Sequence, residues 1–373
     1  MHKKLAVSLL GILLLTTILA WWLLTRPATC EKDSAPKPLT ISRSDTGGSK
    51  LLVGIQPFLE PIDYSCPERL EHKLRAYLDS TRAKGCLPES AIVVFPEYIG
   101  TWLVLLGEPA ETFRANTLSG ALLWAILHQP YRFWIAYRKA TQEGWRDPAA
   151  VAAFRLKAPQ MAKAFHHIFS RLAQSYKIFI VAGSIVLPGA RAENDTLIVD
   201  SNAPLENVSF FYYPDGRVDP KIVKKAFPIA QELGFTRPAD PRTLPVYETP
   251  FGRLGVLICA DSWFPQSYEA IGKVDILVVP SYLMGDSCWA APWRGYSGWP
   301  SPSDVSRLKM TEGEAWLTYA MGGRLPRHNP VGTGLNVFLK GHFWELGADG
   351  RAIFVSKGRT SAVDADIVCL PLP

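Results

Sequence analysis

Short apolar runs that alternate with amphipathic helical segments fill the chain from Lys50 onward, and this alternation limits the possible folds more than any other feature. LLVGIQ is typical of a strand, residues 68–82 of an amphipathic helix, and AIVVF of a buried strand that ends at Pro96-Glu97. A helix at 160–176 and the apolar strands IFIVAGSIVL, GVLIC and DILVVP continue the pattern. Strands and helices in this order predict an α/β fold.

The composition is that of a folded domain. Of the 373 residues, 48% are hydrophobic and 20% are charged, which allows a substantial core. The 40 basic and 34 acidic residues give a formal net charge of +6 without a long basic run. We therefore expect no nucleic-acid partner.

An uncharged apolar run over residues 5–25 precedes this domain and ends at Arg26. A helix of that length spans about 30 Å, the thickness of the hydrocarbon core of a membrane. The run is longer than the apolar region of a cleaved signal peptide, and Trp21 and Trp22 occupy the position of an interfacial aromatic belt. We predict an uncleaved transmembrane signal-anchor helix, with a cleaved signal peptide as the alternative.

Charges around the apolar run set its expected orientation. Lys3 and Lys4 favour a cytoplasmic N-terminus at residues 1–4, so the rest of the chain is expected on the periplasmic or extracellular face. Residues 26–49 are rich in Pro, Ser, Thr, Lys and Gly, which predicts a linker. The globular domain is then expected over residues 50–373.

Residues 101–159 carry many apolar and aromatic side chains that follow no strand alternation. The stretch ALLWAILHQPYRFWIAY predicts helices, and it is too short and too interrupted to span a bilayer. We interpret residues 101–159 as a helical insertion in the domain. Two roles remain open for it: a helical pair packed on the core, or an interfacial surface that touches lipid or shapes access to a site.

The chain has six cysteines, at positions 30, 66, 86, 259, 288 and 369. They show neither a CxxC pair nor zinc spacing, and His166-His167 has no third ligand nearby in the sequence, so no metal site is expected. The number of cysteines does not establish disulfides. The helix predicted between Cys66 and Cys86 would hold them about 25–30 Å apart, and we expect no bond between them.

Three segments place reactive side chains at the ends of predicted strands, where α/β proteins commonly form their sites. In VVFPEY, Glu97 leaves the core with its strand, and a buried carboxylate with a raised pKa is able to act as a general base. In GVLICADSWFP, the thiol of Cys259 and the N–H groups of the following turn converge. In KIVKKAFPIAQELGF, a lysine on a short strand is placed to hold a thiolate. Taken singly, a solvated glutamate, an inert cysteine and a solvated lysine pair are the commoner interpretations.

Together and in this order, the segments resemble the carbon-nitrogen hydrolase (nitrilase) superfamily, which uses a Glu, a Lys and a Cys in that chain order. Phe95-Pro96-Glu97 matches the FPE-like motif of the family, and Val279-Pro280-Ser281 is similar to its V-P-S strand end. The most specific match is to its C-x-D-x-x-F-P motif, formed here by Cys259, Asp261, Phe264 and Pro265.

Two lysines compete for the lysine position of this resemblance. The family pattern resembles K-x-x-L, with a second glutamate eight positions after the lysine. Lys224 meets this spacing, with Phe227 in the place of the leucine and Glu232 as the second acid. Lys225 would place a proline and a leucine at those positions. We therefore predict Lys224 as the catalytic lysine.

The resemblance covers about residues 50–355 and implies a fold, an assembly and a chemistry. The fold is a four-layer α-β-β-α sandwich, usually assembled as a homodimer through its outer helices. The chemistry needs neither a metal nor an organic cofactor. Its substrate here would be a small-molecule or lipid-linked amide or a nitrile.

The resemblance also implies a role for each site residue. Glu97 would take the thiol proton, the thiolate of Cys259 would attack the carbonyl or nitrile carbon, and Lys224 would stabilise the oxyanion. Glu232 would orient the lysine and the substrate. Asp261 and Ser262 would support the site.

The sequence departs from the family pattern in places that bear on the substrate. The lysine motif lacks the usual His and Leu, and the late G-x-S is replaced by Gly341-His342-Phe343. One alternative function is acyl transfer to an amine, as in the apolipoprotein N-acyltransferases that share the superfamily. A second alternative is an inactive binding module on the same fold.

Overall fold

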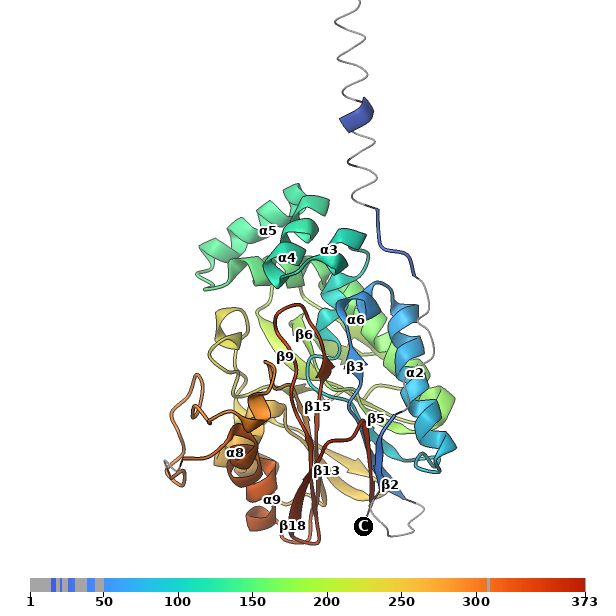
Figure 1. Ribbon diagram of the computed structural model, residues 1–373, viewed down its shortest axis with the longest axis vertical. Helices are drawn as coiled ribbons and strands as arrows, with labels where there is room; N and C mark the ends of the chain where they lie inside the picture. The colour runs from blue at the N-terminus through green and yellow to red at the C-terminus, as the bar shows by residue number, and fades with distance from the viewer. Residues whose placement is uncertain are drawn as a thin grey trace, which may run out of the picture.

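The computed structural model describes residues 15–17, 21, 26–30, 39–43, 50–306 and 309–372. Within these residues, two six-stranded sheets pack face to face, and helices cover the outer face of each sheet (Figure 1). The layers therefore follow the order helix, sheet, sheet, helix. The predicted α/β class is confirmed.

The first sheet has the strand order β1-β19-β2-β4-β5-β10. Its strands are Ile41–Arg43 (β1), Leu51–Ile55 (β2), Ile92–Val94 (β4), Phe179–Val181 (β5), Phe211–Tyr212 (β10) and Ile367–Pro371 (β19). The parallel strands β2, β4 and β5 are connected by α2 (Pro67–Ala83) and α6 (Pro148–Tyr176), which pack on the outer face. Because side chains alternate along a strand, Val53 faces these helices and Leu52 faces the second sheet.

The second sheet has the strand order β12-β13-β14-β15-β17-β18. Its strands are Val246–Thr249 (β12), Gly252–Val256 (β13), Ile276–Ser281 (β14), Thr333–Phe338 (β15), Ala352–Ser356 (β17) and Arg359–Val363 (β18). Its outer helices are Pro265–Ile271 (α7), Glu312–Tyr319 (α8) and Met321–His328 (α9). The two sheets approach closely at Gly54, where a Cβ atom would lie 2.5 Å from Val337 Cγ1.

Three smaller sheets accompany the two large ones. They are Phe58–Leu59 (β3) with Lys340–Gly341 (β16), Arg191–Glu193 (β7) with Thr196–Ile198 (β8), and the three-stranded group of Ile185–Pro188 (β6), Leu205–Ser209 (β9) and Val223–Lys224 (β11). The single strand predicted over IFIVAGSIVL is in fact two strands, β5 and β6. Gly183 separates them with a φ of +66°, and any Cβ there would clash with the carbonyl of Pro96.

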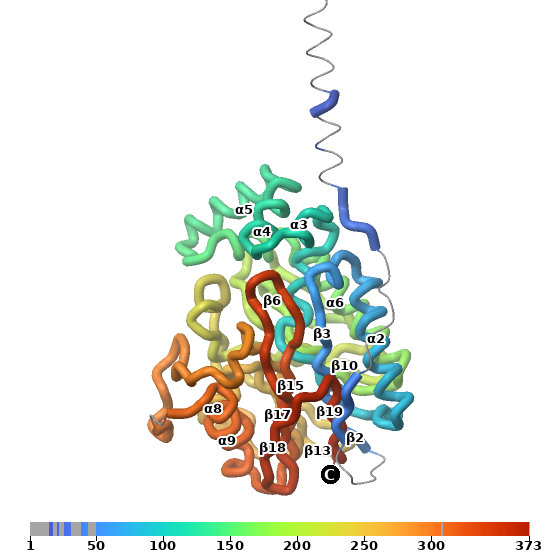
Figure 2. Tube along the Cα trace, in the orientation of Figure 1, coloured from blue at the N-terminus to red at the C-terminus, as the bar shows by residue number. Residues whose placement is uncertain are grey.

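Helices are present in the segment 101–159, as predicted. They are a 3₁₀ helix at Thr101–Leu105, then Ala110–Arg114 (α3), Leu118–His128 (α4), Pro130–Gln142 (α5) and the start of α6. α6 begins at Pro148 rather than at residue 160, because the chain continues as a helix through Pro159. Figure 2 shows α3, α4 and α5 gathered at one end of the molecule.

Most of the predicted anchor over residues 5–25 and most of the linker lie outside the described residues, and residues 15–17 and 21, which are described, are helical. In the part of the chain that the structure describes, no helix has the length and apolar character needed to cross a membrane. Residues 26–30 lie beside α3, where the N–H of Ala28 donates to the carbonyl of Glu108 at 3.0 Å. The segment that follows the apolar run therefore reaches the domain at the α3–α5 end (Figure 1).

A disulfide joins Cys30 to Cys66, the N-cap residue of α2, whereas Cys86 is a free thiol. Replacing Cys30 and Cys66 together by serine is expected to lower the free energy of unfolding by about 2–4 kcal/mol, because the unfolded chain loses a closed loop. Urea denaturation measures the change, with Cys288→Ser as the control that removes a free thiol. An unchanged midpoint in the double variant would contradict the expectation.

Candidate active site

Cys259 stands at the turn between β13 and α7. Its φ is +49°, a left-handed conformation that is uncommon outside glycine. The hydroxyl of Ser262 donates to the carbonyl of Cys259 at 2.7 Å, which braces the turn. Residues held in such strained conformations by their surroundings cluster at functional sites.

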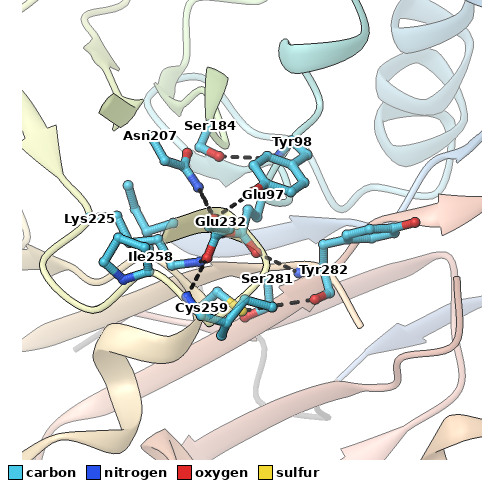
Figure 3. A network of polar contacts seen from close by, with 12 residues as sticks. Glu97, Tyr98, Ser184, Asn207, Lys225, Glu232, Ile258, Cys259, Ser281 and Tyr282 are labelled. Atoms are coloured by element: carbon cyan, nitrogen blue, oxygen red, sulfur yellow. Dashed lines mark hydrogen bonds and ion pairs between the residues drawn. The ribbon is translucent and has the colours of Figure 1, made fainter. Parts of the chain in front are cut away.

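Glu97 follows β4 and is buried beside this turn. Its Oε1 accepts hydrogen bonds from Lys225 Nζ at 2.7 Å and from Asn207 Nδ2 at 2.9 Å. Its Oε2 accepts from the N–H of Tyr282 at 3.1 Å (Figure 3). Burial raises the pKa of Glu97, while Lys225 and a hydrogen bond with the Cys259 thiol lower it to a smaller extent. A carboxylate in this environment is suited to accept a proton near neutral pH.

Lys225, rather than Lys224, lies in the site. Lys225 Nζ donates to Glu97 at 2.7 Å and to Glu232 at 2.6 Å, with 1% of its side chain exposed. Burial lowers the pKa of Lys225, but Glu232 and Glu97 together raise it well above its ordinary value, so the ammonium is retained. Lys224 pairs with Glu206 at 2.7 Å, and 35% of its side chain is exposed. The prediction that Lys224 joins Glu97 and Cys259 is wrong.

The geometry of the strand explains why Lys225, and not Lys224, lies in the site. Side chains alternate along β11 and its continuation, so Val223 and Lys225 share the buried face and Lys224 lies between them on the other face. The spacing of the motif predicted Lys224, but that spacing takes no account of the alternation of side chains along the strand. Val223 could have indicated Lys225, because an apolar residue two positions before a strand residue indicates that both lie on a buried face. By the same rule, however, Ile222 indicates that Lys224 is buried, so the alternation alone did not decide between the two lysines.

Glu232 is the second carboxylate at the ammonium of Lys225, and Asn207 Nδ2 bonds both Glu232 and Glu97. Glu232 Oε2 accepts from Lys225 and from the N–H of Ile229 at 2.8 Å. Its Oε1 accepts from the Tyr98 hydroxyl and from Asn207 Nδ2 at 3.2 Å. Two donors on each oxygen fix the carboxylate against the ammonium of Lys225 (Figure 3).

Asp261 ties the lysine segment to the turn that carries Cys259. Its Oδ1 accepts from the N–H groups of Ala226 at 3.0 Å and Phe227 at 2.8 Å, and its Oδ2 accepts from that of Ile258 at 3.3 Å. Burial raises the pKa of Asp261 to about 7, against the lowering effects of Lys225 and these N–H groups. The residue after Lys225 and the residue before Cys259 therefore share one carboxylate.

Three further residues of the site were missed from the sequence: Tyr98, Asn207 and Tyr282. Tyr98 and Asn207 bond Glu232, and Tyr282 contributes a backbone N–H to Glu97. Tyr98 also has a φ of +63°, which its N–H bond to Ser184 at 3.0 Å helps to hold. Nothing in the local sequence marks these residues, because only the tertiary fold brings them to the carboxylates.

A cavity of about 850 Å³ opens onto Cys259, Glu97, Lys225 and Glu232. The remainder of its wall is mostly apolar and includes the aromatic side chains of Trp102, Phe154, Trp263, Phe264, Trp293 and Trp316. Burial, together with the charge of Glu97, raises the pKa of the Cys259 thiol well above its ordinary value, although Lys225 opposes this. The resting thiol is therefore protonated and needs a base to become a nucleophile.

Among the described residues, one group of cysteine and acidic side chains has the spacing of a metal site. It consists of Cys30, Cys66 and Glu68. The two sulfur atoms are joined in the disulfide, so they are not available as thiolate ligands.

A model of the family "Carbon-nitrogen hydrolase" matches residues 68–296. Among solved structures, an alanine mutant of the Nesterenkonia AN1 amidase from the nitrilase superfamily is 14% identical, with a TM-score of 0.50 over 87% of this chain and 92% of that chain. The NitN amidase of the same organism after removal of its tag is also 14% identical, with a TM-score of 0.50 over 87% and 93%. These likenesses show the fold. A search of curated proteins gave no match. Since the family model matches more than half of the residues of this chain, the chain belongs to the carbon-nitrogen hydrolase family.

Proposed function

We propose that this protein hydrolyses non-peptide carbon-nitrogen bonds of amides, with Cys259 as nucleophile, Glu97 as general base and acid, and Lys225 as the cation that stabilises the oxyanion. One observation carries the proposal: these three side chains meet, together with Glu232, at a large apolar cavity. Glu232 positions Lys225, and Asp261 and the Ser262 hydroxyl support the nucleophile turn.

The first half of the reaction forms a thioester. Glu97 takes the thiol proton as the sulfur of Cys259 attacks the carbonyl carbon. The charge that develops on the carbonyl oxygen is stabilised by the ammonium of Lys225 and by backbone N–H groups of the turn. The C–N bond then breaks, and Glu97 returns the proton to the departing amine.

The second half releases the acid. Glu97 takes a proton from a water molecule, whose oxygen attacks the thioester carbon. The C–S bond breaks, the carboxylic acid leaves, and the sulfur of Cys259 regains its proton. The balance is one amide and one water to one amine and one acid.

We propose that the acyl part of the substrate is long and apolar. Ligand pockets for whole small molecules measure about 300–1,000 Å³, so a cavity of about 850 Å³ holds far more than the reacting amide group. Apolar walls favour hydrocarbon because burial of each methylene is worth about 0.8 kcal/mol.

Ala125→Phe is expected to separate long from short substrates, because Ala125 lines the cavity from α4. Loss of room for two or three methylenes should lower kcat/KM for long-chain N-acyl amides by about ten- to sixty-fold. Turnover of an acetyl amide should stay within about twofold, since the walls far from the thiol are not used. Mass-spectrometric measurement of released acid over a chain-length series tests this, with Leu123→Phe on the exposed face as control. An equal loss at every chain length would contradict the proposed acyl site.

The pH dependence follows from the buried base. Glu97 must be ionised to accept the proton, and burial raises its pKa above the ordinary 4.5. The rate should therefore rise with pH through a limb that lies above pH 4.5. The pKa of Lys225 lies well above its ordinary value of about 10.5. Loss of its proton should therefore not lower the rate at any pH below about 10.5. A pH profile of kcat/KM checks both expectations, and an acidic limb at or below pH 4.5 would contradict the base assignment.

We propose further that residues 5–25 hold the protein at a membrane and that the domain works outside the cytoplasm. The length of the uncharged run supports the anchor. The Cys30–Cys66 disulfide supports the location, since such bonds persist in oxidising compartments. Alkaline carbonate extraction of the full chain, compared with a chain that begins at residue 26, tests the anchor. Assembly as a homodimer also remains a prediction.

Acyl transfer is the second candidate function, favoured by the apolar wall of the cavity, which makes water a poor competitor for the thioester. An amine that entered the cavity would attack the same carbon and give a new amide. Product analysis with and without added primary amines distinguishes the two functions: hydrolysis predicts free acid in both cases.

A further inference from the structure

The helix α4 is apolar on all sides, although the protein covers only part of it. Its sequence LSGALLWAILH carries one titratable side chain, His128. One face lines the active-site cavity through Leu118, Ala121, Leu122 and Ala125. The other face includes Leu123, which is 55% exposed. Helices that are apolar all round are normally covered by a protein core or by lipid.

The neighbouring helix α5 extends this exposed apolar surface. Its exposed large hydrophobic side chains are Tyr131, Trp134, Ile135 and Tyr137, each 39% to 72% exposed. With Leu123 they form what we name the hairpin patch. Among the described residues, five of the eleven exposed large hydrophobic side chains thus fall between positions 123 and 137. This density marks the patch as a surface that a partner covers.

The charged side chains of α4 and α5 are all positive. Residues 118–142 contain Arg132, Arg138 and Lys139 and no aspartate or glutamate. The guanidinium of Arg138 stacks over the ring of Trp134 at 4.9 Å. Aromatic rings beside basic side chains, on a helix that is otherwise apolar, form the pattern of helices that lie in the headgroup region of anionic membranes.

The hairpin patch lies at the end of the molecule where the chain arrives from its apolar run. Pro27 pairs with Pro109, directly before α3, and the run of residues 5–25 ends just upstream. Figures 1 and 2 show α4 and α5 at this same end, away from α9 and β18. A bilayer that held residues 5–25 would therefore lie beside α4 and α5.

We propose that the hairpin patch inserts into the surface of an anionic lipid bilayer, with α4 and α5 lying along the headgroup region. The occupant is lipid rather than a second copy of the chain. A twofold contact through this patch would place Arg132, Arg138 and Lys139 against their own copies, with no acidic side chain in the hairpin to neutralise them. Since the inner face of α4 lines the cavity, the docked hairpin would form the wall between bilayer and site.

Spin-label accessibility tests the proposal on the full chain in vesicles of phosphatidylcholine and phosphatidylglycerol. The label is attached at Ile135→Cys or, as the matched control, at Val331→Cys, an 82% exposed apolar position in the loop between α9 and β15. Both variants also carry Cys259→Ala and Cys288→Ser, which leaves Cys86 and Cys369 as buried thiols. The ratio of collisions with oxygen to collisions with an aqueous nickel chelate should be at least about fivefold higher at position 135.

The charge contribution is tested with Arg132→Gln and Arg138→Gln in the same labelled chain. In these variants, the ratio of oxygen to nickel-chelate collisions at position 135 should fall toward the ratio at position 331. The labelled chain without these substitutions should show the same fall in vesicles of pure phosphatidylcholine.

Equal ratios at positions 135 and 331 in a chain that sediments with the vesicles would overturn the proposal. So would a label at 135 that is shielded from both reagents and lies at short dipolar distance from a second label, since a second copy would then cover the patch. Ratios that are the same with and without anionic lipid would overturn its electrostatic part. The readout needs no catalysis, because every variant lacks the Cys259 thiol. The anchor does not affect the comparison, because every variant retains residues 5–25.

Discussion

Lys225→Met is expected to lower kcat/KM by about 10²–10³, whereas Lys224→Met should leave kcat/KM within about twofold of the parent protein. Loss of the ammonium of Lys225 removes the main oxyanion cation, which is worth roughly 10²–10³ in rate. It also leaves Glu97 and Glu232 as buried carboxylates without their cation, at a cost of about 3–5 kcal/mol in stability. Lys224 pairs with Glu206 at the surface, where such pairs contribute about 0–1 kcal/mol.

Steady-state kinetics and urea denaturation of the two variants separate catalysis from folding. Lys225→Met combined with Glu232→Gln removes one of the uncompensated charges, so its stability should recover in part while its activity does not. An active Lys225→Met protein beside an inactive Lys224→Met protein would contradict the assignment and restore the choice made from the spacing pattern.

Glu97→Gln is expected to lower kcat by about 10²–10⁴, the range for loss of a general acid–base group. The same substitution should lower the pKa of the Cys259 thiol, because the charge of Glu97 contributes to raising it. The pH dependence of alkylation at Cys259 measures that pKa separately from turnover. A thiol that becomes more acidic while catalysis is lost is the signature of a missing base. A thiol pKa that rises in the variant would contradict this account of the site.

The large elements of the fold could be predicted because buried parallel strands are continuous apolar runs. β2, β4 and β14 carry this signal, and α2 follows its apolar periodicity. The boundaries were less predictable, since backbone geometry set them. Gly183 divides one apolar run into two strands, and α6 runs through a proline that would usually end a helix.

Within the candidate site, Glu97 and Cys259 could be located because each directly follows a strand and has a motif of its own. The lysine could not be chosen from spacing, because adjacent residues of a strand face opposite sides and the pattern is off by one position. The partner of Cys66 was equally beyond the sequence. Cys30 reaches it only because residues 26–30 lie along α3, a tertiary contact with no local signal.

In the proposed reaction, Cys259 carries the acyl group of the substrate as a thioester. Rapid acid quenching of the full chain with a long-chain N-acyl amide, followed by intact-mass and peptide analysis, tests it directly. We expect one added acyl mass on the peptide that contains Cys259, removed by neutral hydroxylamine and absent from Cys259→Ala. Full turnover by Cys259→Ala, or an adduct on Cys288 in place of Cys259, would contradict it.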